Sequence, residues 1–360
     1  MSLALLVFTL IIILATVLPL WKNAHWTIRG LDFPRLQLAV LASAILLSQL
    51  YFFNFTAWQH WLLASGVLLC LLWQLWWILP YTPLWPYEVL SSENTNPERQ
   101  LTIITANVLT TNRNAASLIQ LVRQHKPDVL VTLESDLWWQ QQLDCLEKDM
   151  PFTIKCPLDN LYGMHVYSRL ALTDSEIAYL VEDNVPSMHA LLTLKCGNKI
   201  RMHFLHPAPP SPTENEQSIE RDAELIIVAR SIADTQQATI ITGDLNDVAW
   251  SRTTRLFRKL SGLLDPRVGR GMFNTFHASY PFLRWPLDHL FHSQHFTLNQ
   301  IQRLPSIGSD HFALMTTLSY TPSHGAEQNG LTPDKEDKDL ATEITQQQGV
   351  NKKSVPEPGK

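Results

Sequence analysis

The stretch that decides the fold is Ala-Thr-Ile-Ile-Thr-Gly-Asp-Leu-Asn at residues 238–246, where an apolar, β-prone run leads directly into Asp244 and Asn246. Three further runs follow the same pattern, since each is mainly apolar and ends at a polar side chain. They are Leu101–Ala106 before Asn107, Asp128–Leu133 before Glu134, and Lys199–Leu205 before His206. Continuous apolar runs of this length are typical of strands buried within stacked sheets. We therefore predict buried strands whose ends carry polar residues.

Helical segments lie between some of these runs. Residues Ala115–His125 form one, and Glu214–Ile232 form another, with Ile219, Ala223, Ile226 and Ile227 on one face. Strands interleaved with helices favour a mixed α/β domain with two sheets and outer helices. We place this domain at residues 99–320.

The N-terminal part has a different composition, because no Asp, Glu, Lys or Arg lies between Arg35 and Glu88. Three apolar runs, Leu3–Leu20, Leu36–Phe53 and Trp61–Leu79, are each long enough to cross about 30 Å of hydrocarbon. Tryptophans gather at and near the run ends, as expected at membrane interfaces. We predict three transmembrane helices in residues 1–80. Two alternatives are weaker: buried helices of a soluble core would need polar faces, and a signal peptide would need a basic start and a clear cleavage site.

Loop charges predict the orientation in the cell membrane. The first loop carries Lys22, Arg29 and Arg35, whereas the second loop, residues 54–60, carries no Lys or Arg. Positive-inside counting places the first loop in the cytoplasm, together with everything after the third helix. The chain is thus predicted to be a multi-pass membrane protein with a cytoplasmic domain.

Composition also defines a linker and a tail. Residues 81–98 are rich in proline and predict a stiff spacer off the membrane, and the polar residues 321–360 predict a disordered tail. The net charge of −5 argues against a basic protein that coats nucleic acid. The four cysteines lack C-x-x-C spacing, so we predict ordinary buried thiols without a disulfide framework or a zinc site.

The strand ends predict a shared polar cleft. Glu134, Asp244 and Asp310 offer the carboxylate oxygens that a hard cation such as Mg²⁺ prefers. Two Asp-His pairs, Asp288-His289 and Asp310-His311, add imidazoles that transfer protons or donate hydrogen bonds to a phosphoryl oxygen. Each of these short segments, taken alone, also fits an ordinary turn. Only their order and spacing together favour a functional site. His203 and His206 are three apart on a strand and face opposite ways, so His206 is the candidate and His203 is structural.

In this order the residues resemble the endonuclease/exonuclease/phosphatase superfamily, the group of DNase I, exonuclease III-type repair endonucleases, sphingomyelinases and inositol polyphosphate 5-phosphatases. The resemblance covers roughly Leu101 to Leu318. It rests on Asn107, Glu134, Gly163 with Ser168-Arg169, His206-Pro-Ala-Pro-Pro, Gly243-Asp244-Leu245-Asn246, Asp288 and Ser309-Asp310-His311. It implies a four-layer α/β sandwich. Trp250-Ser251 after the G-D-x-N segment, and the N-terminal spans, are similar to the membrane-bound bacterial members.

The resemblance also implies roles for the site residues. Glu134 and Asp310 would bind Mg²⁺ or Mn²⁺, with Asn107 nearby. Asp244 would orient or deprotonate the attacking water, and Asn246 would hold the phosphate. His206 and His311 would contact phosphoryl oxygens, and Asp288 would orient His311.

These features predict a membrane-anchored, metal-dependent phosphoester hydrolase, with the lipid bilayer and a phosphodiester substrate as partners and no obligate protein partner. A nuclease or other phosphodiesterase is the first reading. Its basic groove would come from Arg252, Arg255, Arg258, Lys259, Arg267 and Arg270, which otherwise form a solvated helix face. The alternatives are a phosphodiesterase or phosphatase for phospholipids or inositol phosphates, and a non-catalytic membrane scaffold, which the intact polar set disfavours.

Overall fold

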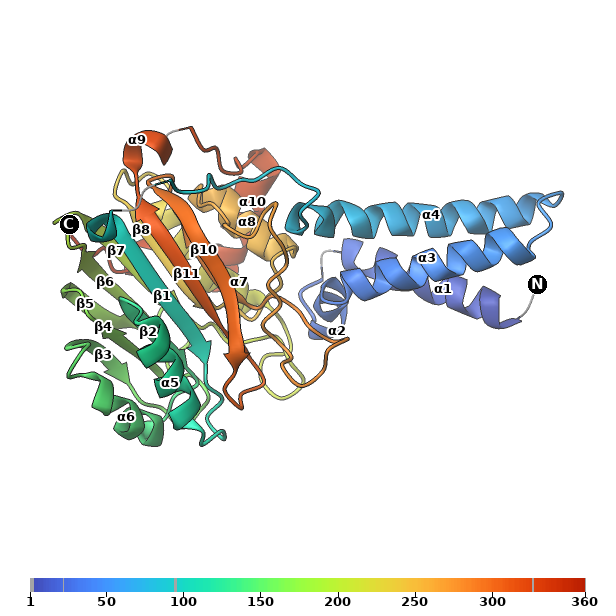
Figure 1. Cartoon of the computed structure of the whole chain (residues 1–360). Coiled ribbons are helices and arrows are strands. Elements are labelled where there is room, and N and C mark those ends of the chain that lie inside the picture. Colours follow the sequence, from blue (N-terminus) through green and yellow to red (C-terminus); the bar gives the residue numbers. More distant parts are fainter. Residues whose placement is uncertain (1–2, 22, 94–95, 326, 360) are drawn as a thin grey trace.

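The computed structural model describes residues 3–21, 23–93, 96–325 and 327–359; Lys22, which enters the predicted orientation, lies outside them. Three long apolar helices extend from one end of an α/β domain (Figure 1). They are α1 (Leu3–Val17), α3 (Arg35–Phe52) and α4 (Trp58–Ile78). With the short 3₁₀ turns that follow α1 and α4, all three are long and apolar enough to cross a membrane. They lie within a few residues of the predicted runs.

The helical bundle has polar contacts as well as apolar packing inside, and its outer surface is apolar. Gln49 donates from Nε2 to Thr9 Oγ1 at 2.8 Å, and Gln74 donates from Nε2 to Thr16 Oγ1 at 3.0 Å. All four of these side chains are buried, whereas apolar residues such as Leu47, which is 67% exposed, face outward. Exposed apolar surface with polar contacts between the helices suits a lipid environment.

The first sheet has six strands. Their spatial order is β10 (Phe296–Ser306), β11 (Phe312–Tyr320), β1 (Gln100–Asn107), β2 (Val129–Leu133), β4 (Met164–Ser168) and β3 (Phe152–Cys156). The β1 and β2 strands run parallel, with Asn107 opposite Leu133, and the other neighbours are antiparallel. The polar residues that follow β1 and β2 therefore emerge at the same end of the sheet.

The second sheet has five strands. Their order is β5 (Leu172–Ala178), β6 (Ser187–Thr193), β7 (Lys199–Leu205), β8 (Thr239–Asp244) and β9 (Asp288–His292). Only β7 and β8 are parallel. Between the two sheets lies one apolar core, to which both contribute alternate residues such as Ile103, Val131, Met202 and Ile240. This alternation follows from the two-residue repeat of a strand.

Helices cover the outer face of each sheet and complete four layers. The α5 (Ala115–His125) and α6 (Leu137–Leu143) helices pack on the first sheet, and α7 (Ile219–Ile232) and α8 (Arg252–Ser261) on the second (Figure 1). The predicted α/β class with two mixed sheets and outer helices is confirmed. The α7 helix begins later than predicted, because residues 216–218 instead pair with the loop between α1 and α3: Trp26 N donates to Glu216 O, and Ser218 N to Ala24 O.

The C-terminal tail differs from the predicted disorder. Within it, α10 (Lys335–Gln347) packs against α7 and α8, and Ala341 and Val355 are buried in the outer core of the second sheet. The short elements α9 (Pro322–Gly325) and η6 (Lys352–Ser354) flank this helix. Few apolar residues are needed here, because an existing helical surface provides the rest of the core.

The proline-rich segment is likewise not a free spacer. Tyr81 and Val89 are buried, and both Glu88 carboxylate oxygens accept hydrogen bonds from Arg258 of α8.

The burial of the cysteine thiols also differs in part from the prediction. All four cysteines are free, but only Cys70 and Cys156 are buried, and Cys145 is exposed in the short η5 turn (Asp144–Leu146).

Candidate active site

The predicted site residues gather at one end of the two sheets. Asn107 ends β1, Asp244 ends β8 and Asp288 begins β9. Glu134 directly follows β2, His206 directly follows β7, and Asp310-His311 directly precede β11. A hydrogen bond of 2.7 Å between the hydroxyls of Thr105 and Thr242 joins the two sheets behind the site. The cleft thus takes side chains from both sheets.

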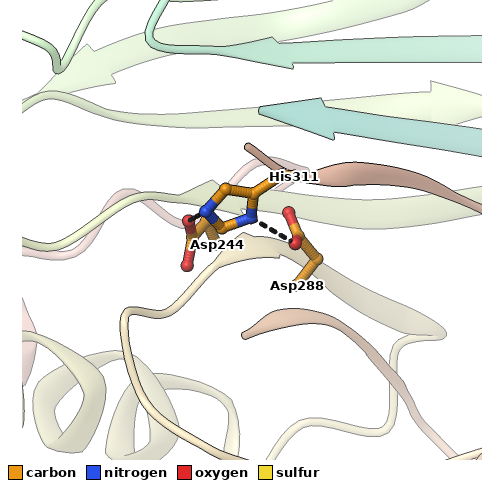
Figure 2. Close-up of side chains that lie close together, drawn as sticks. All are labelled: Asp244, Asp288 and His311. Carbon is orange, nitrogen blue, oxygen red and sulfur yellow. Dashed lines mark hydrogen bonds and ion pairs between the residues drawn. The ribbon is translucent and has the colours of Figure 1, made fainter. Parts of the chain in front are cut away.

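His311 lies between two aspartates of the opposite sheet (Figure 2). Its Nδ1 is 2.8 Å from Asp288 Oδ2, and its Nε2 is 3.5 Å from Asp244 Oδ2. Burial alone would lower the pKa of His311, but the two carboxylates outweigh burial and raise the pKa to about 10. At neutral pH His311 is therefore a buried imidazolium held by Asp288.

A second group surrounds Glu134. Asn107 Nδ2 donates to Glu134 Oε1 at 2.7 Å and to Asp244 Oδ2 at 3.2 Å. Glu134 Oε2 is buried and has no hydrogen-bond partner among the described residues. Burial, with the nearby Asp310 and Asp244 carboxylates, raises the pKa of Glu134 to about 7 despite Asn107 and His311. A buried carboxylate oxygen without a partner costs free energy unless a cation joins it.

The backbone at two of these positions lies in the left-handed region. Glu134 has a φ of +55° and Asn246 a φ of +50°. Residues other than glycine seldom adopt such angles, and they concentrate at functional sites. Asn246 is held there by its own N–H, which donates to Asp244 Oδ1 at 2.9 Å, and by Arg221 Nη1, which donates to its carbonyl at 2.7 Å.

Glycine is required just before this turn. Gly243 has a φ of +155°, and a Cβ at this position would lie 1.8 Å from the Leu205 carbonyl oxygen. The close approach of β7 and β8 thus sets where Asp244 emerges.

On the opposite side of the cleft, Ser309 Oγ donates to the Asn107 carbonyl at 2.8 Å and accepts from His311 N at 3.0 Å, which fixes the Ser-Asp-His segment against β1.

Two sets of residues fit a cation to different degrees. Asp244, Asp288 and His311 offer ligand atoms within 4.8 Å of one another, and this buried group is consistent with a metal site. However, its short distances arise because His311 already bridges both carboxylates, so its donor atoms are occupied. Glu134 keeps a buried oxygen without a partner in the described part of the chain, and Asp310 shares its cleft. Oxygen donors of this kind suit Mg²⁺ or Mn²⁺.

The cleft has a volume of about 660 Å³. Glu134, Asn246, Asp310 and His311 line it, and Asn107, Asp244 and Asp288 stand behind them. The rest of the lining comes from the loop between α1 and α3, from Pro209, Pro210 and Glu214, and from residues 276–287. Sequence patterns missed these walls, because nothing in the loop's composition shows that it folds back onto the catalytic domain.

His206 lies behind the cleft. It is 2% exposed, its ring centroid is 5.4 Å from that of Tyr162, and its Nδ1 has no hydrogen-bond partner among the described residues. Burial lowers the pKa of His206 to about 4, although Asp244 opposes the shift. It is therefore neutral at pH 7. Its predicted contact with a phosphoryl oxygen stays a prediction.

The other two histidines considered in the sequence lie on the outer face of the second sheet. His203 Nδ1 is 2.7 Å from His189 Nδ1, and His289 Nδ1 is 2.7 Å from Arg267 Nη2. His289 Nε2 is also 2.9 Å from the Asp247 carbonyl. Strand alternation therefore separates both histidines from the cleft, as predicted for His203, and His289 is not one of the cleft imidazoles.

Four of the six basic residues after the G-D-x-N segment are held in contacts within the chain. Arg258 and Arg267 are buried against Glu88 and Asp265. Lys259 pairs with Asp337 at 2.6 Å, and Arg270 Nη2 donates to the Val89 carbonyl at 2.6 Å. None of these side chains lines the described cleft. Arg258 and Arg270 attach the linker to the domain, and Lys259 attaches the tail.

These features define a two-sheet α/β fold with a polar site at the strand ends. The family described as "Endonuclease/Exonuclease/phosphatase family" matches residues 104–311, more than half of the chain, and the chain belongs to this family. Members of the family are metal-dependent phosphoesterases, and the buried Asp-Asp-His group is consistent with a metal site.

Solved structures share the fold at low sequence identity. D. rerio TDP2 complexed with single strand DNA product has a TM-score of 0.51 and 19% identity, over 61% of this chain and 99% of that chain. The human Nocturnin catalytic domain with bound sulfate anion has a TM-score of 0.51 and 15% identity, over 62% and 95%. An endonuclease/exonuclease/phosphatase from Beutenbergia cavernae has a TM-score of 0.51 and 16% identity, over 62% and 72%. Among curated proteins, no sequence matches the chain.

Proposed function

We propose that this chain is a membrane-anchored phosphodiesterase that uses Mg²⁺ or Mn²⁺. One observation carries the proposal: Glu134, whose Oε2 has no hydrogen-bond partner among the described residues, and the His311 imidazole held by Asp288 line the same cleft. A phosphodiester is an anion, so its hydrolysis needs positive charge at the phosphate and an aligned water. This cleft offers a place for a cation beside a fixed cationic side chain.

The metal would be held by Glu134 and Asp310, with Asn107 beside them. Asn107 positions Glu134 through the 2.7 Å hydrogen bond to Oε1 and leaves Oε2 for the cation. When bound, the metal would act as a Lewis acid toward the phosphoryl group.

The chain's own side chains would supply the remaining chemistry. Asp244 would accept a proton from the attacking water; burial raises its pKa, which favours proton uptake. His311, oriented by Asp288, would donate a hydrogen bond from Nε2 to a phosphoryl oxygen in place of its long contact to Asp244. Asn246 and His206 would contact the other phosphoryl oxygens, as the family resemblance implies.

The site residues favour phosphodiester hydrolysis, and the choice among phosphodiester substrates rests on other features. D. rerio TDP2, which shares the fold, was solved with single strand DNA product, and a nuclease is therefore one candidate. In this chain three of the basic residues that favoured a nuclease, Arg258, Lys259 and Arg267, are engaged in structural pairs away from the cleft. A scaffold without activity is disfavoured, because all the predicted site residues are present at the strand ends.

We also propose that α1, α3 and α4 span the cell membrane, as in the membrane-bound bacterial type, with the catalytic domain in the cytoplasm. The loop between α1 and α3 contacts the catalytic domain, so both lie on one side of the bundle, as positive-inside counting requires. The chain should stay in membranes after a carbonate wash. Recovery of the full-length chain in the soluble fraction would refute the three spans.

The function is tested with the purified full-length chain in detergent and bis-p-nitrophenyl phosphate as substrate. Hydrolysis should require Mg²⁺ or Mn²⁺ and should stop on addition of EDTA. The Asp244→Asn variant, purified in the same way, shows whether a contaminating hydrolase is present. Turnover that persists in EDTA would overturn the proposal.

A further inference from the structure

We infer that the substrate is an amphiphilic phosphodiester resident in the bilayer, whose headgroup reaches the cleft from the membrane side. This inference rests on the proposed hydrolase function and names its substrate class. It follows from which residues form the cleft, what their side chains are, and where the cleft lies relative to the apolar helices.

The loop between the first two apolar helices forms one wall of the cleft. Trp26, Arg29, Gly30, Phe33 and Pro34 of this loop line the same cavity as Glu134 and His311. The wall is fixed to the catalytic domain: Arg29 Nη2 donates to Thr253 Oγ1 at 2.6 Å, and Trp250 Nε1 donates to the Asp32 carbonyl at 2.9 Å. The membrane part is thus a component of the cleft and more than an anchor.

The facing wall is also apolar. Phe276, Leu283, Trp285 and Leu287 line it, and the Phe33 and Trp285 rings meet edge to face with centroids 5.8 Å apart. The cleft therefore joins a polar end, at the carboxylates and His311, to walls rich in aromatic and aliphatic side chains. Such a lining matches a molecule with a phosphate at one end and an apolar group at the other.

The cleft lies at the membrane-proximal end of the domain. Pro34, which lines it, directly precedes α3, the second apolar span. Gln37, in the first turn of α3, donates from Nε2 to the Phe282 carbonyl at 2.8 Å, which holds the segment 276–285 against the span. The Phe282 side chain is 88% exposed, and its neighbour Leu283 lines the cleft. An exposed aromatic side chain beside the first turn of a span is typical of a membrane interface.

The charge of the cleft disfavours nucleic acid. Arg29 is the one Lys or Arg among the described residues that line it, and its Nη1 is 3.7 Å from Asp32. Three carboxylates, Glu134, Glu214 and Asp310, share the lining. A polyanion would need several cations along its path, whereas a single headgroup needs only the reaction centre.

The test compares two diesters with the same leaving group. The full-length chain in phosphatidylcholine nanodiscs with Mg²⁺ is given hexadecyl p-nitrophenyl phosphate or methyl p-nitrophenyl phosphate. In each, a water oxygen bonds to phosphorus while the bond to the nitrophenyl oxygen breaks, and the products are an alkyl phosphate and p-nitrophenolate. Burial of several methylenes predicts that kcat/KM is at least about 100-fold higher for the hexadecyl diester. A single-stranded oligonucleotide is the third substrate.

Substitutions in the two apolar walls of the cleft distinguish recognition of the hexadecyl chain by the cleft from simple partitioning of the diester into the bilayer. Phe33→Ser and Trp285→Ser should lower the hexadecyl/methyl ratio of kcat/KM at least about tenfold, mainly through KM. The matched control is Phe152→Ser, at an aromatic residue of β3 that is 39% exposed and outside the cleft; it should leave the ratio unchanged.

Each adverse result has a separate meaning. Equal kcat/KM for the two diesters, a ratio unaffected by both wall variants, or faster cleavage of the oligonucleotide would overturn the substrate class and leave the hydrolase function standing. Absence of Mg²⁺-dependent hydrolysis of all three substrates would overturn both.

Discussion

The indole N–H of Trp250 donates a hydrogen bond to the main-chain carbonyl of Asp32, with 2.9 Å between Nε1 and O. Trp250 follows the G-D-x-N turn that carries Asp244, and Asp32 belongs to the loop between the first two apolar helices. Both residues are buried. One hydrogen bond thus connects the apolar helical part of the chain to the turn that positions a candidate site residue.

Loss of this bond should destabilise the chain measurably. Trp250→Phe keeps an aromatic ring beside Tyr81 but leaves the Asp32 carbonyl unpaired, which we expect to lower the free energy of unfolding by about 1–2 kcal/mol. The matched control is Trp139→Phe, because Trp139 is fully buried and its Nε1 has no hydrogen-bond partner among the described residues. Thermal melting of both variants in detergent checks the difference. Equal melting temperatures would show that the Trp250 bond contributes nothing.

The ion pair between Glu88 and Arg258 should stabilise the join between linker and domain. Glu88→Gln leaves the buried guanidinium without a counter-charge, and we expect a loss of about 3 kcal/mol in unfolding free energy. Asp234→Asn, in an exposed pair with Lys352 at 3.9 Å, should change little. Similar melting temperatures for the two variants would refute a structural role for Glu88. The same reasoning predicts that removal of residues 1–90 weakens the domain as well as releasing it from the membrane.

Substitutions in the cleft should reduce turnover far more than substitutions on the outer face of the second sheet. Asp244→Asn and His311→Ala should each reduce turnover at least about 100-fold, since each removes an acid–base or electrostatic group. His203→Ala and His289→Ala should affect turnover only as far as they affect stability, because both side chains lie on the outer face. Turnover of the four variants, with a melting curve for each, checks this. Comparable losses for His203→Ala and Asp244→Asn would contradict the assignment of faces.

The pH dependence of stability should report on His311 in the metal-free chain. Its pKa is raised from 6.5 to about 10, so its contribution to stability is complete below pH 6.5 and is lost as the pH rises through about 10. His311→Gln lacks this contribution, and its melting temperature should fall less steeply between pH 7 and 10. Parallel pH profiles for the two proteins would show that His311 is not held as an imidazolium.

Local patterns in the sequence were sufficient for the strands and for the polar residues at their ends. The Lys199–Leu205 strand and the Ala115–His125 helix have the predicted bounds, because apolar repeats and capping residues act over a few neighbours. The position of Asp288 behind His311 depends on the pairing of β8 with β9, which a single sequence does not encode locally.

The errors have a common physical cause. The tail and the linker contain too few apolar residues to fold alone, yet both find an existing surface, as Val355 and Glu88 show. The loop between α1 and α3 was predicted to matter only for topology, because its contacts with Thr253 and Trp250 join residues more than two hundred positions apart. Such long-range contacts leave no periodic signal in the sequence.

The central claim is that a divalent cation at Glu134 supports phosphodiester hydrolysis, and a metal titration of turnover tests it most directly. Initial rates with bis-p-nitrophenyl phosphate are measured for the full-length chain and for Glu134→Gln as Mn²⁺ is increased from an EDTA-treated start. Glutamine keeps the shape and removes the charge that holds a hard cation. We predict no turnover of either protein without metal, and a half-maximal Mn²⁺ concentration at least about tenfold higher for the variant. Turnover without metal, or the same Mn²⁺ dependence for both proteins, would contradict the account.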